Sequence, residues 1–174
     1  MEDLSLHLLD IVENSTRAGA TLIEIELKEN REKRLLEIFI KDNGPGMDKE
    51  MVASVTDPFV TTRTTRRVGL GLSFFKQSAE EAGGHFSIQS VKGRGTEVRA
   101  TFQIDHIDRK PVGDIGSTMI SLILGNPDID FSFKSDLDGN EIEFDTREIR
   151  KELGGSIAIT DPVVLDLIKG LFEE

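Results

Sequence analysis

The sequence predicts an α+β fold, a two-layer α/β sandwich in which helices cover one face of a mixed sheet. Two observations carry this prediction. Segments with the apolar spacing of amphipathic helices interleave with segments in which apolar and polar residues alternate as they do in strands. Two pairs of these strands are joined by short turn sequences typical of hairpins. Interleaved helices and strands with hairpins favour a sheet of mixed direction with its helices on one face.

The first predicted helix covers residues 2–18. Its buried face is indicated by apolar residues at helical spacing, followed by a serine: Leu4, Leu8, Ile11, Val12 and Ser15. A polar stripe runs beside that face at steps of three and four residues: His7, Asp10, Asn14 and Arg17. Gly19 can end the helix, because glycine readily adopts the left-handed conformation common at helix C-termini.

Two strands are predicted next, at residues 21–30 and 34–42, because every second residue in each is apolar. The second strand runs into Asp42-Asn43-Gly44-Pro45-Gly46, a cluster of turn residues that cannot continue it. Asp48 can then cap a short helix over residues 49–55, since its side chain can accept a hydrogen bond from a free backbone N–H.

A helix and a hairpin complete the first part of the chain. Residues 57–69 are expected to form an irregular loop, and residues 70–82 a helix that ends at a pair of glycines. Residues 85–91 and 96–102 alternate again, and the Lys92-Gly93-Arg94-Gly95 turn between them predicts a hairpin.

A domain boundary is expected at residues 105–112, a polar linker that contains a proline. It would separate residues 1–104 from a small acidic α+β appendage of unknown role at residues 113–174. The elements predicted in the appendage are a helix over 115–124, a hairpin of 129–134 with 141–144, and helices over 146–153 and 162–172.

Composition indicates a globular protein that binds neither nucleic acid nor membrane. The 174 residues include 21 Lys+Arg against 32 Asp+Glu, and most of the net charge of −11 lies in residues 105–174. An acidic segment does not neutralise phosphates, so no nucleic-acid partner is expected. No apolar run approaches the ~20 residues of a membrane span. The acidic N-terminus does not resemble a secretory signal, so a cytoplasmic location is expected. The lack of Cys excludes disulfides, thiolate metal sites and cysteine nucleophiles.

Four short pieces carry the candidate chemistry. They are Asn14, Asp42-x-Gly44-x-Gly46, Gly69-Leu70-Gly71-Leu72 and Gly93-Arg94-Gly95-Thr96. Each alone is a common turn or packing feature, but a nucleotide site explains all four together. The start of a helix can bind phosphates, and glycines there let the backbone approach the oxygens closely. Mg²⁺ needs few protein oxygens when phosphates supply the others, so the amide of Asn14 is a candidate for the single protein ligand. The carboxylate of Asp42 can accept a hydrogen bond from an exocyclic amine, which selects adenine over guanine.

These pieces, in this order and at this spacing, resemble the GHKL superfamily, which contains gyrase, Hsp90, the catalytic domains of histidine kinases, and MutL. The resemblance covers about residues 4–102. The segment DIVENSTRAGAT is similar to the first helix of MutL, whereas DPFVTTR and GLGLS are similar to stretches of sensor histidine kinases. The resemblance implies the ATP-binding Bergerat fold, with ATP and Mg²⁺ as cofactors.

The resemblance also implies roles for individual residues. Asn14 would be the Mg²⁺ ligand and Asp42 would read the adenine, to which Thr96 would connect through Asp42 or a water. Residues 60–68 would form a short ATP lid, in which Arg63, Arg66 and Arg67 become candidate phosphate partners. The full set of implied ATP-binding residues is Asn14, Arg17, Asp42, Gly44, Gly46, Met47, Thr61, Thr62, Arg63, Gly69, Leu70, Gly71, Leu72 and Thr96.

Two departures from the family pattern bear on activity. Hydrolytic members carry a Glu four residues before the Asn, where this chain has Asp10, whose side chain is one methylene shorter. Asp10 is therefore either a candidate general base or a polar residue hydrogen-bonded near the site. Histidine kinases carry an upstream helix pair with a phosphoacceptor His. Nothing precedes residue 1 here, so self-phosphorylation in that manner is not expected.

The leading hypothesis is an ATP-binding, histidine-kinase-like regulatory protein that acts on an unidentified protein partner, as a protein kinase or as a nucleotide-driven switch. One alternative is a weak Mg²⁺-dependent ATPase with Asp10 as general base. Another is a non-catalytic ATP-binding interaction module. A MutL-like repair clamp is disfavoured by the short chain and its acidic C-terminal segment.

Overall fold

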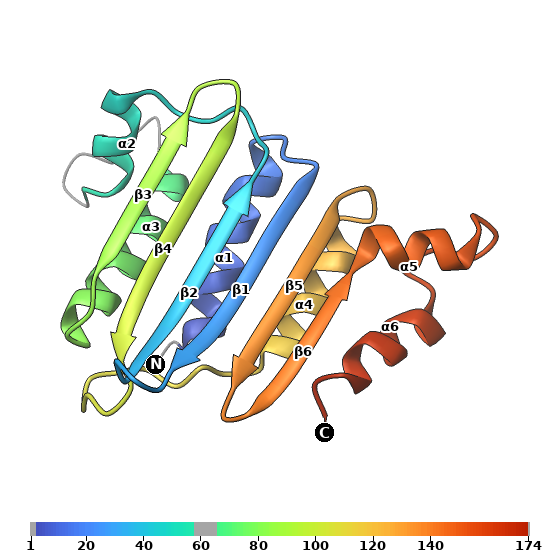
Figure 1. The fold of residues 1–174 in the computed structure, drawn as a ribbon. Coiled ribbons are helices and arrows are strands. Elements are labelled where there is room, and N and C mark those ends of the chain that lie inside the picture. The colour runs from blue at the N-terminus through green and yellow to red at the C-terminus, as the bar shows by residue number, and fades with distance from the viewer. Residues whose placement is uncertain (1–2, 58–65, 174) are drawn as a thin grey trace.

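A computed structural model describes residues 3–57 and 66–173, and for residues 66–70 it describes the backbone alone. Helices and strands alternate along these residues (Figure 1). In chain order the elements are α1 (Leu4–Arg17), β1 (Leu22–Asn30), β2 (Leu35–Asp42), α2 (Lys49–Val55), α3 (Arg66–Glu81), β3 (Phe86–Val91), β4 (Gly95–Gln103), α4 (Ile115–Gly125), β5 (Asp130–Leu137), β6 (Asn140–Asp145), α5 (Thr146–Leu153) and α6 (Pro162–Gly170).

The strands in the described residues join one sheet in the order β3-β4-β2-β1-β5-β6. Neighbouring strands are antiparallel except β1 and β5, which run parallel. A parallel pair needs a crossover connection, and α4 provides the helix of the connection that leads into β5. Helices α1, α3 and α4 lie on the same face of the sheet (Figure 1). The predicted fold class, an α+β sandwich with a mixed sheet, is confirmed.

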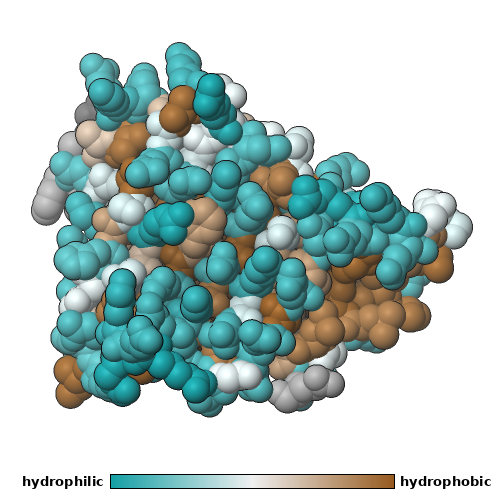
Figure 2. All heavy atoms as spheres, viewed as in Figure 1, coloured by the Kyte–Doolittle hydropathy of each residue, from teal (hydrophilic) through white to brown (hydrophobic). Residues whose placement is uncertain are grey.

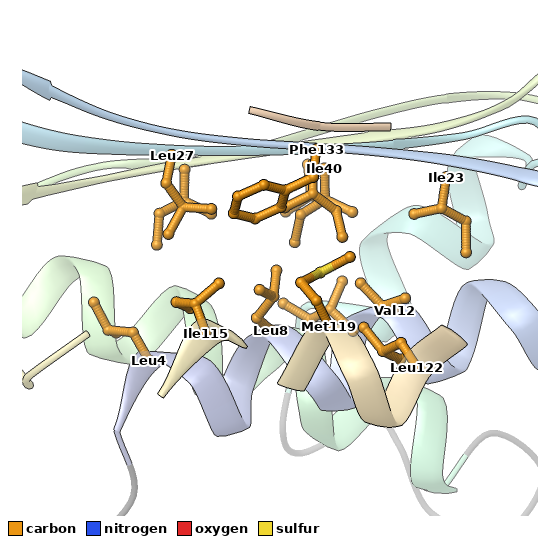
Figure 3. Close-up of a cluster of buried hydrophobic side chains, with 14 of the residues drawn as sticks. Leu4, Leu8, Val12, Ile23, Leu27, Ile40, Ile115, Met119, Leu122 and Phe133 are labelled. Atoms are coloured by element: carbon orange, nitrogen blue, oxygen red, sulfur yellow. The ribbon is translucent and has the colours of Figure 1, made fainter. Parts of the chain in front are cut away.

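The hydrophobic core fills the space between the sheet and these helices. Figure 3 shows Leu8 and Val12 of α1 and Met119 of α4 directed toward the sheet, where Ile40 and Phe133 point back at them. All five side chains are buried. Full burial of a large apolar side chain contributes about 1.5–3 kcal/mol to stability, so this layer fixes α1 firmly against the strands.

Residues 113–174 share this sheet and core. The parallel register of β5 on β1 places Phe131 opposite Ile23 and Phe133 opposite Ile25, and all four side chains are buried. The segment therefore extends the sheet of the first 104 residues instead of forming a sheet of its own. That residues 113–174 are a separate domain stays a prediction.

Helix α3 begins at Arg66, four residues before the predicted start at Leu70, which corrects that expectation. Gly69 and Gly71 thus lie inside the first turns of the helix and not ahead of it. The glycines suggested a boundary because each costs about 1 kcal/mol relative to alanine within a helix. Burial of residues further along, such as Phe75, offsets that cost.

Most other boundaries agree with the sequence to within one or two residues. The β5–β6 hairpin is longer than predicted, because the ladder continues to the pair Leu137 and Asn140. Asp138 and Gly139 make the two-residue turn between them, both with positive φ, as a type I′ turn requires. No helix in the described part of the chain has the length and apolar character needed to cross a membrane.

Candidate functional site

Helix α1 provides one wall of a pocket. Four residues on one side of the helix face into the pocket: Ile11, Asn14, Ser15 and Ala18. The neighbouring stripe of α1, which includes Leu8 and Val12, is held in the core. The position of the polar residues is therefore fixed by the packing of the apolar ones.

Asp42, the last residue of β2, lies across the pocket from α1. The Ser15 hydroxyl donates a hydrogen bond of 2.6 Å to one oxygen of its carboxylate. The backbone N–H of Gly44 donates one of 2.9 Å to the other oxygen. Hydrogen bonds to a charged acceptor are stronger than neutral ones, so the two donors fix the orientation of the carboxylate. Each oxygen keeps a second lone pair with which it can accept a hydrogen bond from a ligand.

The turn after Asp42 packs so closely on the β3–β4 hairpin that both segments need glycine. A β-carbon on Gly46 would lie 2.1 Å from the carbonyl oxygen of Val91, and one on Gly95 would lie 2.0 Å from that of Asp42. Both glycines also have positive φ, 70° and 128° respectively. The Asp-x-Gly-x-Gly and Gly-x-Gly-Thr motifs therefore support each other, and together they position Asp42.

Thr96 stands beside Asp42, because the two residues are paired in the β2–β4 ladder and their side chains share a face. The Thr96 hydroxyl lies 2.8 Å from the hydroxyl of Ser90 on β3. The Ser90 hydroxyl oxygen also accepts a hydrogen bond of 2.7 Å from the backbone N–H of Met47. These contacts tie the floor of the pocket to the segment that leads into α2.

These elements enclose a pocket with about 540 Å³ of open space. Its lining residues are Ile11, Asn14, Ser15, Ala18, Ile40, Asp42, Pro45, Gly46, Met47, Leu72, Thr96 and Val98. Apolar walls with a few convergent polar groups are typical of sites for small molecules. The polar groups come from α1, β2 and β4, three segments far apart in the sequence.

Helix α3 passes close to Asn14 at one side of the pocket. A β-carbon on Gly71 would lie 3.4 Å from the amide nitrogen of Asn14 and 3.6 Å from the β-carbon of Asp10. Leu72, which is buried, contributes to the lining. Gly69 and Leu70 belong to the preceding turn of the same helix. The glycine motif and Asn14 are thus brought together, as the nucleotide-site hypothesis requires.

Some residues singled out from the sequence are not part of the lining. Arg17 is exposed, and its guanidinium lies 3.9 Å from the carboxylate of Glu13, one turn earlier. Asp10 is exposed on α1 and does not line the pocket. Gly44 is buried behind the pocket, where it holds the Asp42 carboxylate. Three predicted contacts lie outside the described residues: Thr61, Thr62 and Arg63. The predicted residues that do line the pocket are Asn14, Asp42, Gly46, Met47, Leu72 and Thr96.

Two serines that support the site were not singled out from the sequence. The sequence places Ser15 on the buried face of the first helix and Ser90 in a strand. A serine on an otherwise apolar helix stripe is a usable signal, because a buried hydroxyl needs a hydrogen-bond partner. Ser90 gives no such signal, since its role arises only when β3 pairs with β4.

The side chains of the pocket suit a metal ion that arrives with its own ligands. Among the residues that the structure describes, no group of three or more His, Cys, Asp or Glu side chains is placed to hold a metal. Asn14 offers one amide oxygen. A divalent cation here would therefore depend on phosphate oxygens and waters for its other ligands, as Mg²⁺ commonly does.

Comparison with known families identifies the class. The model of the family described as histidine kinase-, DNA gyrase B-, and HSP90-like ATPase matches residues 2–106, more than half of the chain. The chain belongs to this family. Residues 2–106 are a histidine-kinase-like ATP-binding domain, and the pocket described above lies within them.

Curated relatives include a putative sensor protein and sensor histidine kinases. A putative sensor protein of Shewanella frigidimarina is 35% identical over 107 residues, which cover 58% of this chain and 16% of that protein. The sensor histidine kinase WalK of Bacillus subtilis is 34% identical over 92 residues, covering 50% and 15%. The sensor histidine kinase AtsR of Burkholderia thailandensis is 28% identical over 104 residues, covering 55% and 17%. The chain thus spans less than a fifth of the length of these relatives.

A solved structure shares the fold. The N-terminal domain of a DNA repair protein matches 82% of this chain, and the match covers 52% of that chain, with a TM-score of 0.51 and 18% identity. A match to 82% of 174 residues is longer than residues 2–106, so the likeness includes part of the C-terminal segment. At this identity the comparison shows the fold alone.

Proposed function

We propose that this chain binds Mg²⁺-ATP in the pocket between α1 and the strand ends, and uses the nucleotide to act on a protein partner. The action is either transfer of the γ-phosphoryl group or a nucleotide-driven conformational switch. The observation that carries the proposal is that Asn14 and Asp42, from separate elements, line one pocket. Membership of an ATPase family supports ATP as the ligand.

Asp42 is suited to select adenine. Ser15 and Gly44 hold both of its oxygens in place, so the remaining lone pairs point in a fixed direction. The exocyclic amine of adenine donates to such an acceptor. Guanine presents a carbonyl at the same place, which would leave the carboxylate facing another acceptor. Ile40, Met47 and Val98 supply apolar surface for the faces of the base.

Asn14 is suited to the phosphate end. It lies against α3 at Gly71, where the absence of a side chain lets a ligand approach the helix. The amide oxygen of Asn14 would bind Mg²⁺ together with phosphate oxygens. The metal ion would neutralise negative charge on the phosphates. The chain then has only to position the phosphates and to supply further positive charge, as in other phosphoryl-transfer sites.

Action on a protein partner is supported by the kind of relatives that the chain has. Several of them are sensor histidine kinases, and this chain matches a small part of each. Asp10 stands where hydrolytic members carry a Glu, and it does not line the pocket. A shorter, exposed carboxylate is a poor base for activating water, which favours transfer or switching over rapid hydrolysis.

A weak ATPase is the second candidate, and one observation favours it. The β-carbon of Asp10 lies 3.6 Å from the β-carbon position of Gly71, so Asp10 is near the glycine motif despite its exposure. A single bridging water would bring its carboxylate within reach of a reacting water.

The experiment follows both the binding and the fate of the phosphate. Calorimetry of the full chain with Mg²⁺-ATP and Mg²⁺-GTP tests the site, and we expect binding of ATP with a clear preference over GTP. Incubation with γ-labelled ATP then separates the candidates. Label on a co-purified protein supports the kinase, label in free phosphate supports the ATPase, and retention in ATP supports the switch. Equal affinity for ATP and GTP would contradict the assigned role of Asp42.

A further inference from the structure

A second hollow lies at the β6 edge of the sheet, away from the nucleotide pocket over β2 and β4. It is a groove with about 980 Å³ of open space, which runs between α6 on one side and α5 with β6 on the other. Its lining residues are Glu143, Phe144, Asp145, Glu148, Ile149, Glu152, Leu153, Val164, Leu167, Ile168 and Leu171. None of them lines the nucleotide pocket. We call it the α5–α6 groove.

Helix α6 and its C-cap residue expose three large apolar side chains, of which Leu167 and Leu171 line this groove. Val163 and Leu167, one helical turn apart, are 67% and 70% exposed, and Leu171 follows four residues later at 42%. Val164 and Ile168, on the neighbouring stripe, are buried and attach the helix to the core. Figure 2 shows hydrophobic side chains gathered where α6 lies in Figure 1, beside the hydrophilic side chains of α5. A contiguous exposed apolar surface with a polar rim is typical of an interaction site.

The rim of the groove is acidic. Four carboxylates and no lysine or arginine occur in its lining. Glu143 lies 3.8 Å from Lys134, and Asp145 is paired with Arg147. Glu148 and Glu152 lie four residues apart on α5, and neither has a salt bridge or side-chain hydrogen bond with the other residues of the described ranges, 3–57 and 66–173. Like charges at this spacing on a helix repel each other, so a cation brought between them would be stabilised.

We propose that the α5–α6 groove docks a basic amphipathic helix of a protein partner. Leucine-type side chains at three- and four-residue spacing on that helix would pack on Leu167 and Leu171, which line the groove. Lysine or arginine side chains beside them would reach Glu148 and Glu152. This is recognition of a helix in a groove, in which apolar anchors give affinity and charged flanks give orientation. The interaction does not depend on the nucleotide pocket, so it stands apart from the proposed ATP chemistry.

Charge complementarity selects this occupant over two others. A second copy of the chain would bring the same acidic rim against itself, and each chain carries a net charge of −11. An anionic lipid surface would be repelled by the same carboxylates. A basic protein segment relieves the repulsion that either alternative increases.

The test uses the full chain and two fluorescent synthetic helices of about 18 residues, enough for five turns. Both carry leucine at positions i, i+3, i+4 and i+7. One has lysine at the polar positions, and its companion has glutamate there. Fluorescence anisotropy at about 150 mM salt, where long-range attraction is screened, gives the affinity. We expect the lysine helix to bind and the glutamate helix not to bind.

Matched variants locate the site. Leu167→Gln should weaken the lysine helix about tenfold, as loss of an interface anchor does. The double variant Glu148→Gln/Glu152→Gln should weaken it several-fold and flatten its salt dependence. Ile107→Gln removes a more exposed but isolated apolar side chain, 93% exposed in the connection before α4, and Glu26→Gln/Glu80→Gln removes two exposed carboxylates elsewhere. We expect both controls to bind the helix like the unaltered chain, and all variants to keep their circular dichroism and melting temperature.

Several results would overturn the proposal. Failure of the lysine helix to bind would remove its basis, and equal binding to all variants would indicate general attraction to an acidic protein. Self-association in sedimentation that Leu167→Gln abolishes would assign the groove to a second copy. Binding of anionic phospholipid vesicles through Leu167 would assign it to a membrane.

Discussion

A hydrogen bond of 2.6 Å joins Ser15 of helix α1 to the carboxylate of Asp42 at the end of strand β2. It connects the wall of the pocket that carries Asn14 with the residue proposed to read the base. Ser15 is buried and the bond is partly buried, so it is stronger than the same bond in water. One serine hydroxyl therefore links the helix that carries Asn14 to Asp42, the two residues proposed to bind opposite ends of the ligand.

Asp42→Asn should weaken ATP binding about 100-fold and reduce the preference for ATP over GTP. The amide of Asn can turn its NH₂ group toward the exocyclic amine of adenine, so that two donors face each other. The hydrogen bonds from Ser15 and Gly44 also lose their charged acceptor. Together these changes should reduce the binding free energy of ATP by about 2–3 kcal/mol. Calorimetry with both nucleotides measures the effect, and the melting temperature controls for folding. Unchanged affinity would show that Asp42 does not contact the base.

Ser15→Ala should weaken ATP binding by about five- to tenfold, because it removes one hydrogen bond to the Asp42 carboxylate, worth about 1 kcal/mol. Ser87→Ala is the matched control, since Ser87 is an exposed serine on β3. We expect the control to bind like the unaltered chain. If both changes had the same effect on the ATP affinity measured by calorimetry, Ser15 would have no role in positioning Asp42.

Gly95→Ala should destabilise the fold far more than Gly93→Ala, although both glycines have positive φ in the same hairpin. A β-carbon on Gly95 would lie 2.0 Å from the carbonyl oxygen of Asp42, whereas one on Gly93 has nothing within 4 Å. Backbone strain alone costs about 1–2 kcal/mol at either position. Urea unfolding should therefore give about that loss for Gly93→Ala and at least about 2 kcal/mol more for Gly95→Ala. Similar losses would mean that the hairpin does not pack on Asp42 as described.

Asn14→Ala should remove the effect of Mg²⁺ on ATP binding. If the Asn14 amide is the protein's ligand to the ion, the unaltered chain binds ATP more tightly with Mg²⁺ than with a chelator. The variant should bind ATP weakly and equally in both conditions. A variant that keeps the full gain from Mg²⁺ would place the ion elsewhere.

Asp10→Asn should keep Mg²⁺-ATP binding and leave phosphate release unchanged, because the Asp10 side chain is exposed and does not line the pocket. Release of labelled phosphate under saturating ATP measures this. Loss of turnover with binding intact would instead support the ATPase candidate with Asp10 as its base.

The sequence was sufficient to predict the local features of the molecule. The alternation of Ile23, Ile25 and Leu27 indicated a half-buried strand, and all three are buried in β1. The glycine motifs, taken together with Asn14 and Asp42, pointed to a nucleotide site. In the structure Gly46 and Gly95 have positive φ, which other residues rarely adopt. Periodicity and turn chemistry act over a few residues, so a single sequence displays them directly.

The pairing of strands that lie far apart in the sequence could not be predicted in the same way. The parallel register of Phe131 on Ile23, which extends the sheet into the C-terminal segment, leaves no local signature. The hydrogen bond of Ser90 with Thr96 likewise depends on which strands become neighbours. The start of α3 at Arg66 shows a different limit, since burial beyond Gly69 and Gly71 outweighs their low helix propensity.

The most direct test is a crystal structure of the full chain with Mg²⁺ and a non-hydrolysable ATP analogue. We predict one nucleotide between α1 and the ends of β2 and β4, with the exocyclic amine of the base on the Asp42 carboxylate and the Asn14 amide on the metal ion. A nucleotide bound elsewhere, or bound in this pocket with its phosphates at Asp42, would contradict the account.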